Sequence, residues 1–581
     1  MRIPEERYFD ASDGASLFYR YWPPVAGTLR RALVLLHRGH EHSGRLQHLV
    51  EELDLPETAM FAWDARGHGR SAKAAIGKAS IGLLIKDVDD FARHVSTEFQ
   101  IPINETAIVG QSVGAVLAAA WVHDYAPRIR AMVLAAPAFK VKLYVPFART
   151  ALGLMQSIRG DFQVNSYVKP RALTHDPERI ASYLADPLIR RPIAVNILLA
   201  LYTTADRVIE DAQAIRVPTQ VLISGADYVV HLGPQHRFFD RLGSTVKEKH
   251  VMPGFYHDTL GEKDRALAIS KVRDFLIKQF AHPPIEDSLL DADRAGYTKD
   301  EYERLRRPPS FFQSLQFGST RLAMRTGGRL SAGIRLGLTT GFDSGSTLDY
   351  VYRNRTAGFT PIGKAIDWGY LNAIGWRGIR IRKVHLERLL ARAMELLRAE
   401  HRPVRVADIA AGHGRYVLET IERQPVKPAS VVLRDFSEIN VREGSELIRQ
   451  KNMQSIARFE RGDAFDRRAV SGIQPRPTLG VVSGLYELFP ENAPIRESLA
   501  GFADAIEPGG YLIYTGQPWH PQLEMIARTL PSHRDHQPWI MRRRTQAEMD
   551  QLVAAAGFQK IEQLADDWGI FTVSLAQRLS G

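Results

Sequence analysis

The stretch that decides the fold is Thr106-Ala-Ile-Val-Gly-Gln-Ser-Val-Gly-Ala-Val-Leu-Ala-Ala-Ala-Trp-Val122. It begins as a short apolar run typical of a strand, turns sharply at Gly110-Gln-Ser-Val-Gly114, and continues as an alanine-rich helix. So sharp a turn strains Ser112 and requires small neighbours, which the two glycines provide. A Gly-x-Ser-x-Gly pentapeptide alone is a weak signal, but this strand-turn-helix setting predicts a nucleophile elbow that presents the Ser112 hydroxyl at a helix start.

Strands and helices alternate on both sides of the elbow. The pattern predicts a β-hairpin over 9–22 and buried strands at 32–36 and 59–63. The two buried strands end in polar, glycine-containing loops, His37-Arg-Gly-His-Glu-His-Ser-Gly-Arg45 and Asp64-Ala-Arg-Gly-His-Gly-Arg-Ser71. This alternation predicts an α/β fold around a mostly parallel sheet, with its site at the carboxyl ends of the strands.

A nucleophilic serine needs a histidine base, and the histidine needs a carboxylate to orient it. In a fold with this elbow, both partners follow the serine, the acid first, each on a loop after a strand. The strand-like run from Pro218 ends in Asp227, and the run from Lys249 ends in His257. We therefore predict Ser112, Asp227 and His257 as a catalytic triad.

Three histidines, His37, His40 and His42, lie together in the first polar loop. Neighbouring histidines can indicate a metal site, but no carboxylate-histidine helix motif accompanies them. We expect them to support the loop, and we predict no metal.

Together these segments resemble the α/β hydrolases, especially the monoacylglycerol lipases, lysophospholipases and S33-type serine aminopeptidases, over about the first 280 residues. The resemblance implies an oxyanion hole formed by the backbone N–H groups of Gly39 and Val113. Arg38 stands where the family usually has glycine. Residues 138–216 are rich in large apolar side chains and resemble a helical lid, which favours a lipid-like ester over a peptide as the substrate.

A second chemical centre is Arg405-Val-Ala-Asp-Ile-Ala-Ala-Gly-His-Gly-Arg-Tyr416, which leads from a strand into a helix. Its glycines allow a cofactor to approach the backbone. Val417 occupies the third-glycine position of the dinucleotide fingerprint, which disfavours NAD. Asp435 ends the next strand, 21 residues beyond Gly414, where an acid can bind ribose hydroxyls, and Asp463 follows later.

This ordered series resembles the class I S-adenosylmethionine-dependent methyltransferases over about residues 380–581. The resemblance implies S-adenosyl-L-methionine as the cofactor, and the implied binding residues are Asp408, Ala410, Gly412, Gly414, Asp435 and Asp463. Ala410 replaces a glycine common in the first motif. Methyl transfer depends mainly on positioning, so no base is predicted, although Tyr486, Glu487, Tyr514, Gln517 and His520 follow strands on the expected acceptor side.

The domain organisation we expect is an α/β hydrolase domain at 1–282, a linker at 283–310, a basic, partly helical segment at 311–400 and a Rossmann-like methyltransferase domain at 401–581. The 581 residues contain no cysteine, which excludes disulfides, cysteine-bound zinc and thiol catalysis. Neither a secretory signal nor a membrane span is indicated, so we expect a cytoplasmic protein.

Positive charge is concentrated in one region. The net charge is +11, and residues 299–383 hold 15 Lys and Arg against 6 Asp and Glu. This region could bind an anionic membrane surface or nucleic acid, or could simply be a solvated face. We favour peripheral contact with the inner membrane surface over nucleic acid.

The function predicted from the sequence is a bifunctional enzyme, a serine hydrolase of a lipid-like ester fused to a methyltransferase whose acceptor is unknown. A peptidase or acyltransferase would use the same triad. A further alternative is an inactive hydrolase domain that serves the methyltransferase as a lipid-binding module.

Overall fold

The computed structural model describes residues 2–74, 79–145, 147–166, 168–282 and 286–580. The chain divides into two units, Met1–Glu286 and Asp287–Gly581.

The second unit begins inside the range 283–310 that we expected to be a linker, of which 283–285 lie outside the described residues. Helix α9 (Tyr297–Arg306) occupies part of this range. Asn492 Nδ2 donates to the carbonyl of Leu290 at 3.0 Å, and Arg528 Nη1 donates to that of Arg307 at 2.6 Å. The prolines and charges of this segment predicted a linker, and in the structure side chains from far along the chain bond the backbone of its described part.

Unit 1 is built on an eight-stranded sheet of order β1-β2-β4-β3-β5-β6-β9-β10. The first two strands form the expected hairpin, β2 pairs with β4 antiparallel, and the remaining neighbours pair in parallel. The strands are β1 (Glu5–Asp10), β2 (Ser16–Trp22), β3 (Arg31–Leu36), β4 (Thr58–Trp63), β5 (Thr106–Gln111), β6 (Ala131–Ala135), β9 (Thr219–Ser224) and β10 (Lys247–Met252). The loops that follow β5, β9 and β10 therefore meet at one edge of the sheet.

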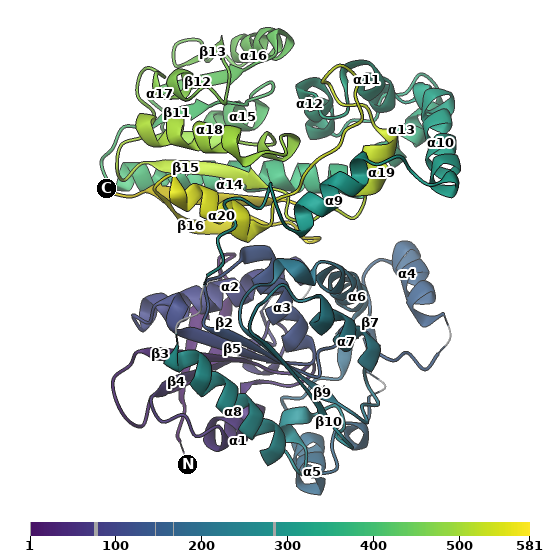
Figure 1. The fold of residues 1–581 in the computed structure, drawn as a ribbon, viewed down its shortest axis with the longest axis vertical. Coiled ribbons are helices and arrows are strands. Elements are labelled where there is room, and N and C mark those ends of the chain that lie inside the picture. The colour runs from purple at the N-terminus through teal and green to yellow at the C-terminus, as the bar shows by residue number, and fades with distance from the viewer. Residues whose placement is uncertain (1, 75–78, 146, 167, 283–285, 581) are drawn as a thin grey trace. The chain divides into compact units, whose positions relative to one another are not determined.

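Helices cover both faces of this sheet (Figure 1). Alternate strand residues such as Leu33 and Leu35 share a core with helices α1 (Gln47–Glu52) and α8 (Ala266–Ala281). The other face is packed by the remaining helices of the sheet, α2 (Ile81–Glu98), α3 (Val113–Tyr125) and α7 (Leu232–Arg241).

Between β6 and β9 the chain forms a lid. It contains the helices α4 (Ala148–Arg159), α5 (Pro177–Ala185) and α6 (Val195–Glu210) and the short antiparallel pair β7 (Gln163–Asn165) and β8 (Pro192–Ala194). Residues 146 and 167 of this lid lie outside the described part of the chain.

Unit 2 is built on a seven-stranded sheet of order β13-β12-β11-β14-β15-β17-β16. The strands are β11 (Arg405–Asp408), β12 (Ser430–Asp435), β13 (Ala457–Arg461), β14 (Leu479–Val482), β15 (Tyr511–Gly516), β16 (Phe558–Ala565) and β17 (Thr572–Arg578). The first five run parallel, and β17 is antiparallel to both of its neighbours. This is a Rossmann-like sheet with one reversed strand.

Two apolar cores enclose this sheet. The helices α14 (Ile374–Ala399), α15 (Arg415–Arg423) and α16 (Glu438–Gln450) contribute to one core. The other contains residues of α17 (Arg467–Ser471), α18 (Asn492–Ala505) and α20 (Gln546–Ala555).

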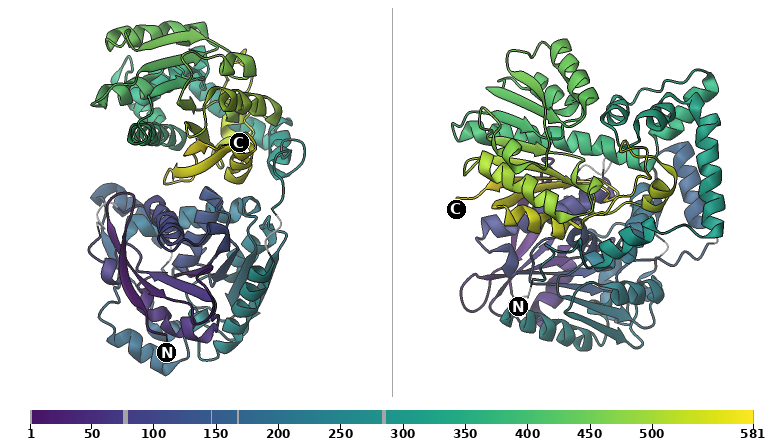
Figure 2. Two further views of the ribbon diagram at one scale, coloured as in Figure 1. Left: turned by 90° about the vertical axis from the view of Figure 1, so that its left-hand side faces the viewer. Right: turned by 45° about the horizontal axis from the view of Figure 1, so that its top comes forward.

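Residues 311–373, which we call the cap, form a separate group of helices beside this sheet (Figures 1 and 2). They are α10 (Phe311–Arg325), the short η8 (Gly327–Leu330), α11 (Ala332–Thr340), α12 (Gly345–Arg353) and α13 (Pro361–Leu371). Ile334, Phe342 and Leu371 of the cap pack with Trp376 and Ile379 of α14 in a third core of this unit. None of the helices in the described part of the chain combines the length and apolar character needed to cross a bilayer.

Candidate functional sites

The elbow at Ser112 joins β5 to α3. Ser112 has φ 56° and ψ −114°, a conformation that strains a residue with a side chain. A Cβ atom on Gly110 would lie 2.6 Å from the carbonyl oxygen of Gly114, and one on Gly114 would lie 2.6 Å from that of His37. Both glycines are therefore required by close backbone contacts.

The structure brings the three predicted triad residues together. Ser112 Oγ lies 2.7 Å from His257 Nε2, and His257 Nδ1 lies 2.8 Å from Asp227 Oδ2. Asp227 follows β9 and His257 follows β10, as the strand-end argument expected. With the proton on Nδ1, the imidazole donates to the carboxylate and accepts from the serine, which is the arrangement that general-base activation needs.

Asp227 is set to remain ionised. Its Oδ1 accepts hydrogen bonds from the backbone amides of Val229 at 2.7 Å and Val230 at 2.9 Å. Burial opposes ionisation, but the charge and hydrogen bond of His257 and these two amides outweigh it and hold the pKa of Asp227 below its usual value. An anionic Asp227 can stabilise the imidazolium that forms when His257 takes a proton.

The two predicted oxyanion residues lie close together. A Cβ atom on Gly39 would lie 3.3 Å from Cγ2 of Val113. Arg38, the departure from the family pattern, is buried and donates to Glu41 through Nε at 2.9 Å and Nη2 at 2.6 Å. Its Nη2 also lies 3.3 Å from Asp258 Oδ2, so carboxylates hold the guanidinium that replaces the usual glycine.

Asp258 is a functional candidate that the sequence analysis missed. It is 1% exposed and accepts from Gln111 Nε2, at the end of β5, and from Arg179 Nε of lid helix α5, both at 2.8 Å. Its carboxylate thus joins the elbow strand, the lid and the residue after His257. Only its position next to His257 could have drawn attention to it.

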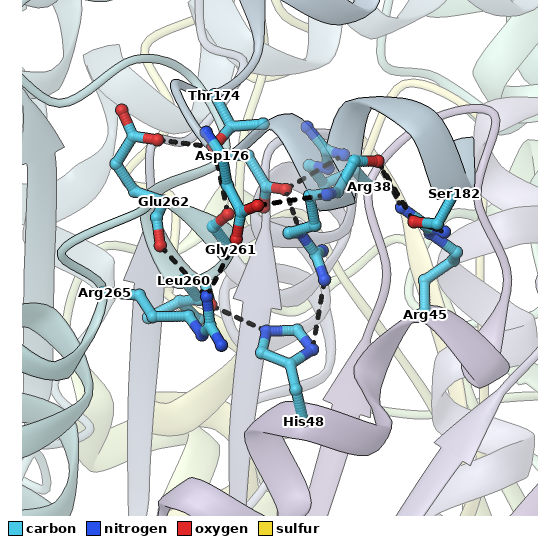
Figure 3. A network of polar contacts seen from close by, with 12 residues as sticks. Arg38, Arg45, His48, Thr174, Asp176, Ser182, Leu260, Gly261, Glu262 and Arg265 are labelled. Carbon is cyan, nitrogen blue, oxygen red and sulfur yellow. Dashed lines mark hydrogen bonds and ion pairs between the residues drawn. The ribbon is translucent and has the colours of Figure 1, made fainter. Parts of the chain in front are cut away.

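The network around Asp258 continues along the base of the lid (Figure 3). Glu262 accepts from the hydroxyl of Thr174, and Arg265 Nη1 donates to Asp176 at 3.2 Å. On the other side, Arg45 Nη1 donates to Ser182 at 2.9 Å. Polar contacts therefore fasten the α5 part of the lid to the loops that carry the site.

A cavity of about 280 Å³ opens at the triad. Ser112 and His257 lie in its wall, and the lid supplies apolar side chains, among them Leu143, Val164, Ile193 and Leu198. A cavity whose surface is mostly apolar but that also holds polar groups suits a ligand with an apolar chain.

The loop histidines are engaged by the protein itself. His37 Nδ1 lies 2.6 Å from the carbonyl of Arg38, and its Nε2 accepts from the amide of Ala65 at 3.0 Å. His40 Nδ1 lies 2.6 Å from the carbonyl of Arg190, and His42 Nε2 lies 2.9 Å from Asp186 Oδ2. Among the residues that the structure describes, no group of three or more His, Asp or Glu is arranged to hold a metal ion.

In unit 2 the glycine loop follows β11 as predicted. Gly412 has φ 58° and Gly414 has φ 71°, both in the left-handed region. A Cβ atom on Gly414 would lie 2.4 Å from Cδ1 of Leu433, so only glycine fits there. The loop consequently presents backbone without bulky side chains at 412 and 414.

A hydrogen bond between Asp408 and Ala410 stabilises the conformation of this loop. Asp408 is fully buried, and its carboxylate accepts from the hydroxyl of Tyr416 and from the amide of Ala410, the latter at 3.2 Å. Burial raises the pKa of Asp408 to about 7. In this structure Asp408 therefore positions the loop.

Asp435 lies at the end of β12 and is only partly buried. It accepts from the amides of Gly412 and Ser437, both at 2.9 Å, and from Asn440 Nδ2 at 3.0 Å. Asp463 lies beyond β13, is exposed, and accepts from the amide of Phe465 at 2.9 Å.

The first turn of α12 covers the space between the glycine loop and Asp435, which the sequence analysis did not foresee. The Cα of Gly345 would lie 3.7 Å from a Cβ atom on Gly412, and a Cβ atom on Gly345 would lie 2.4 Å from Oδ1 of Asn440. Gly345 and Gly412 lack side chains, so only backbone atoms of α12 lie over the loop at this point.

These residues fit S-adenosyl-L-methionine. The backbone at Gly412 is partly exposed beside the first turn of α12, whereas Gly414 is buried, and a carboxylate can accept about four hydrogen bonds. Asp435 makes three, so it has capacity left for a hydroxyl of the ribose.

The geometry defines two classes of domain, an α/β hydrolase with a serine–histidine–aspartate set and a class I methyltransferase with a Rossmann-like sheet. A family model described as "Serine aminopeptidase, S33" matches residues 27–264. A model described as "Putative methyltransferase" matches residues 272–578, more than half of the chain. The protein belongs to this methyltransferase family and carries a hydrolase-like domain in front of it.

Individual proteins are similar to the whole chain or to its first half. The "Uncharacterized protein YnbC" of Escherichia coli is 54% identical over 579 residues, which is 99% of each chain. The monoacylglycerol lipase of Mycolicibacterium smegmatis is 25% identical over 279 residues, 47% of this chain and 96% of its own. The crystal structure of Paleococcus ferrophilus monoacylglycerol lipase covers 48% of this chain and 99% of its own, with 20% identity and a TM-score of 0.40. The two family models confirm the two-family resemblance and the fold class predicted from the sequence.

Proposed function

We propose that unit 1 is a serine hydrolase of a lipid-like ester and that unit 2 transfers a methyl group from S-adenosyl-L-methionine. The observation that carries the first half is the contact of Ser112 Oγ with His257 Nε2 at 2.7 Å inside a strained elbow. The apolar lid lining supports a lipid-like substrate, as do relatives named monoacylglycerol lipase and monoglyceride lipase.

In this mechanism Ser112 Oγ attacks the ester carbonyl while His257 takes its proton, and the alcohol leaves with that proton. The negative charge on the carbonyl oxygen is stabilised by the backbone N–H groups of Gly39 and Val113. Water, activated by His257, then attacks the acyl-serine, and the carboxylic acid leaves. Asp227 keeps the imidazole in the required tautomer throughout.

The hydrolase half is tested by labelling the full chain with a fluorophosphonate, which reacts with activated serines. We expect labelling of the wild type, complete loss in Ser112→Ala, and unchanged labelling in Ser270→Ala, which removes a hydroxyl of α8 that bonds only its own helix. An unlabelled wild-type chain would favour the inactive lipid-binding module. If labelling succeeds, turnover of 1-oleoylglycerol, an aminoacyl p-nitroanilide and an ester with added alcohol separates the lipase, peptidase and acyltransferase alternatives.

For unit 2, bound S-adenosyl-L-methionine would supply an electrophilic methyl group next to the acceptor. Gly412 would let it approach the partly exposed backbone, Gly414 would keep the turn tight, Asp435 would accept from the ribose, and Asp463 would lie toward the adenine. Asp408 and Ala410 would hold the loop in shape.

Calorimetric titration of the full chain with S-adenosyl-L-methionine tests this half. Asp435→Ala removes a charged hydrogen-bond acceptor, so we expect affinity to fall about 10- to 100-fold. Glu438→Ala removes an exposed carboxylate nearby, paired with Arg461 at 2.7 Å, and should leave affinity unchanged. Equal affinity of the wild type and Asp435→Ala would argue against the assigned ribose contact.

A further inference from the structure

A second cavity, of about 400 Å³, lies wholly within unit 2. Cap helices α10, α11 and α13 and the first turns of α14 surround it, together with residues that follow β14 and β15. Most of its wall is apolar, including Ile334, Ile366, Trp376, Ile379, Met541 and Phe571. A space of this size and character suits an apolar chain.

Polar groups gather in one part of this wall. Arg382 Nη1 lies 3.3 Å from Glu487 Oε1, and both side chains are buried. Gly484, just after β14, is so close that a Cβ atom there would lie 3.0 Å from Arg382 Nη2. Because β14 neighbours β11, these groups lie at the strand end next to the one that carries the glycine loop.

His520 and Gln517, which follow β15, also line the cavity. Burial lowers the pKa of His520 to about 4, so this imidazole is neutral at physiological pH. Of the five polar residues expected near the acceptor, Glu487, Gln517 and His520 therefore reach this cavity. Tyr486 and Tyr514 instead bond Ser498 and Asp550 elsewhere.

Three buried polar groups in the cavity wall have unused hydrogens. Within the described chain, Nε of Arg382, Nε1 of Trp539 and the hydroxyl of Tyr370 have no hydrogen-bond partner. A buried donor without a partner is costly, so a ligand that brings oxygen acceptors gains from meeting them. All three can donate, and two of them, Arg382 Nε and Trp539 Nε1, can only donate, which favours carboxylate, ester, carbonyl or phosphate oxygens.

We propose that this cavity binds the methyl acceptor of unit 2, and that the acceptor is an amphipathic molecule with an acyl-type chain and an oxygen-bearing head group. The chain lies among the apolar cap residues, and the head group lies near Gly484, Arg382 and Trp539. This inference rests on the proposed methyltransferase function, because it takes the neighbouring strand end as the cofactor site.

The probe is cis-parinaric acid, a fluorescent fatty acid, titrated into the full chain. If both cavities take acyl chains, the wild type binds two equivalents. Ile379→Trp fills the unit 2 cavity and Leu198→Trp fills the unit 1 cavity, and each should bind one equivalent. The proposal is overturned if a folded Ile379→Trp chain still binds two equivalents. It is also overturned if the wild type binds one equivalent and Leu198→Trp binds none.

A more conservative substitution tests the same site with less risk of misfolding. Trp539→Phe removes the unused donor and keeps most of the volume, and should weaken the unit 2 equivalent about five-fold. Trp568→Phe makes the same change at a residue stacked under Arg377 at 4.7 Å, outside the cavity wall, and should bind as the wild type does. Equal binding by both variants contradicts a head group at Trp539.

Calorimetry with S-adenosyl-L-methionine on the same proteins keeps the two proposals apart. Fatty-acid binding in unit 2 without cofactor binding would support the acyl site and refute the methyltransferase mechanism. Cofactor binding that persists while Ile379→Trp leaves fatty-acid stoichiometry unchanged would refute the acyl site alone.

The outer surface of the cap is rich in exposed apolar side chains. Helix α10 has no buried residue, and Phe311, Phe312, Leu315 and Leu322 on it are between 63% and 80% exposed. Phe359, Ile362 and Trp368, in and just before α13, are similarly exposed. Helix η8 links the two regions, because Leu330 packs beside Gly363 at the start of α13.

The charges on this surface have one sign. The three carboxylates of the cap, Asp343, Asp349 and Asp367, are all buried and hydrogen-bonded. The seven basic residues are exposed except for Arg335, which is half-buried over the ring of Phe359 at 4.0 Å. They are Arg321, Arg325, Arg329, Arg335, Arg353, Arg355 and Lys364.

We infer that this surface binds an anionic lipid bilayer. Exposed aromatic and aliphatic side chains suit insertion at the headgroup boundary, and surrounding cations suit acidic lipids. Nucleic acid would use the cations but would leave the aliphatic side chains exposed to water.

Sedimentation with phosphatidylcholine vesicles, with and without phosphatidylglycerol, tests this inference. We expect the full chain to sediment only with the acidic vesicles, and Phe311→Ser/Phe312→Ser to reduce the bound fraction several-fold. Leu154→Ser/Ile158→Ser, which alters the exposed apolar face of lid helix α4, is the matched control and should bind normally. Loss of binding in the α4 variant alone, or retention of RNA but not vesicles at the same salt, would overturn the inference.

Discussion

Replacing Asp258 by asparagine should destabilise unit 1 strongly although the substitution changes almost no volume. The carboxylate is 1% exposed and lies between two guanidinium groups, 2.8 Å from Arg179 Nε and 3.3 Å from Arg38 Nη2. A neutral amide at this site leaves Arg179 without its carboxylate, while Arg38 keeps its pair with Glu41.

Removing one partner of a buried ion pair costs about 3–5 kcal/mol, and the remaining pair with Glu41 places Asp258→Asn near the lower figure. The cost should depend on pH. Burial opposes ionisation of Asp258, but Arg179 and Arg38 outweigh it and hold its pKa far below its usual value. A depressed folded pKa gives stability that is complete above about pH 4, the ordinary value, and is lost as the pH falls further. The difference between wild type and variant should therefore shrink toward pH 3.

The assay is urea denaturation of the full chain at each pH, monitored by hydrogen exchange of the backbone amides in β5 and α3. A local probe is needed because a chain of two units does not unfold in one step. Asp240→Asn is the control, since Asp240 is 65% exposed and pairs with Lys249 at 3.1 Å, and should cost less than about 1 kcal/mol. The reasoning is refuted if Asp258→Asn costs less than about 1 kcal/mol at pH 7, or if its cost is the same at pH 3.

Two further predictions concern the loops of the two sites. Gly114→Ala places a Cβ atom 2.6 Å from the backbone oxygen of His37, so it should cost about 1–3 kcal/mol and reduce Ser112 labelling at least ten-fold. Gly153→Ala on α4 meets nothing within 4 Å, and labelling equal to this control would contradict the prediction. Burial raises the pKa of Asp408 to about 7, above the value of an unfolded aspartate. The free energy of unfolding of unit 2 should therefore fall as the pH rises from about 4 to 7, by up to roughly 4 kcal/mol. Asp408→Asn should abolish that fall, measured as hydrogen exchange of residues 405–423, and an unchanged pH dependence would count against it.

The sequence predicted those features of unit 1 that are written in local pattern. The strand, the turn glycines and the helix around Ser112 are contiguous, and Asp227 and His257 could be found because each ends a strand. The contacts of Arg38 could not be predicted in the same way. Glu41 lies in the same loop as Arg38, but Asp258 lies in a distant loop that only folding brings close.

Unit 2 shows the same division. The glycine loop and the acid at Asp435 follow regular strand-turn-helix spacing, whereas the cover that Gly345 provides depends on how α12 packs. The region 311–400 was expected to be basic and partly helical, but composition does not reveal which of its apolar side chains line a cavity and which remain exposed. That separation appears only when α10 and α13 are placed against α14.

Helix α14 has 26 residues and is about 39 Å long at 1.5 Å per residue. Trp376 and Ile379 near its start belong to the core shared with the cap, and Leu390 and Leu397 near its end belong to the core under the sheet. Because one helix packs in both cores, their unfolding is coupled, and the cap and the sheet of unit 2 should unfold together in one cooperative thermal transition. A ligand that tightens the cap would then raise the temperature at which the distant strands come apart.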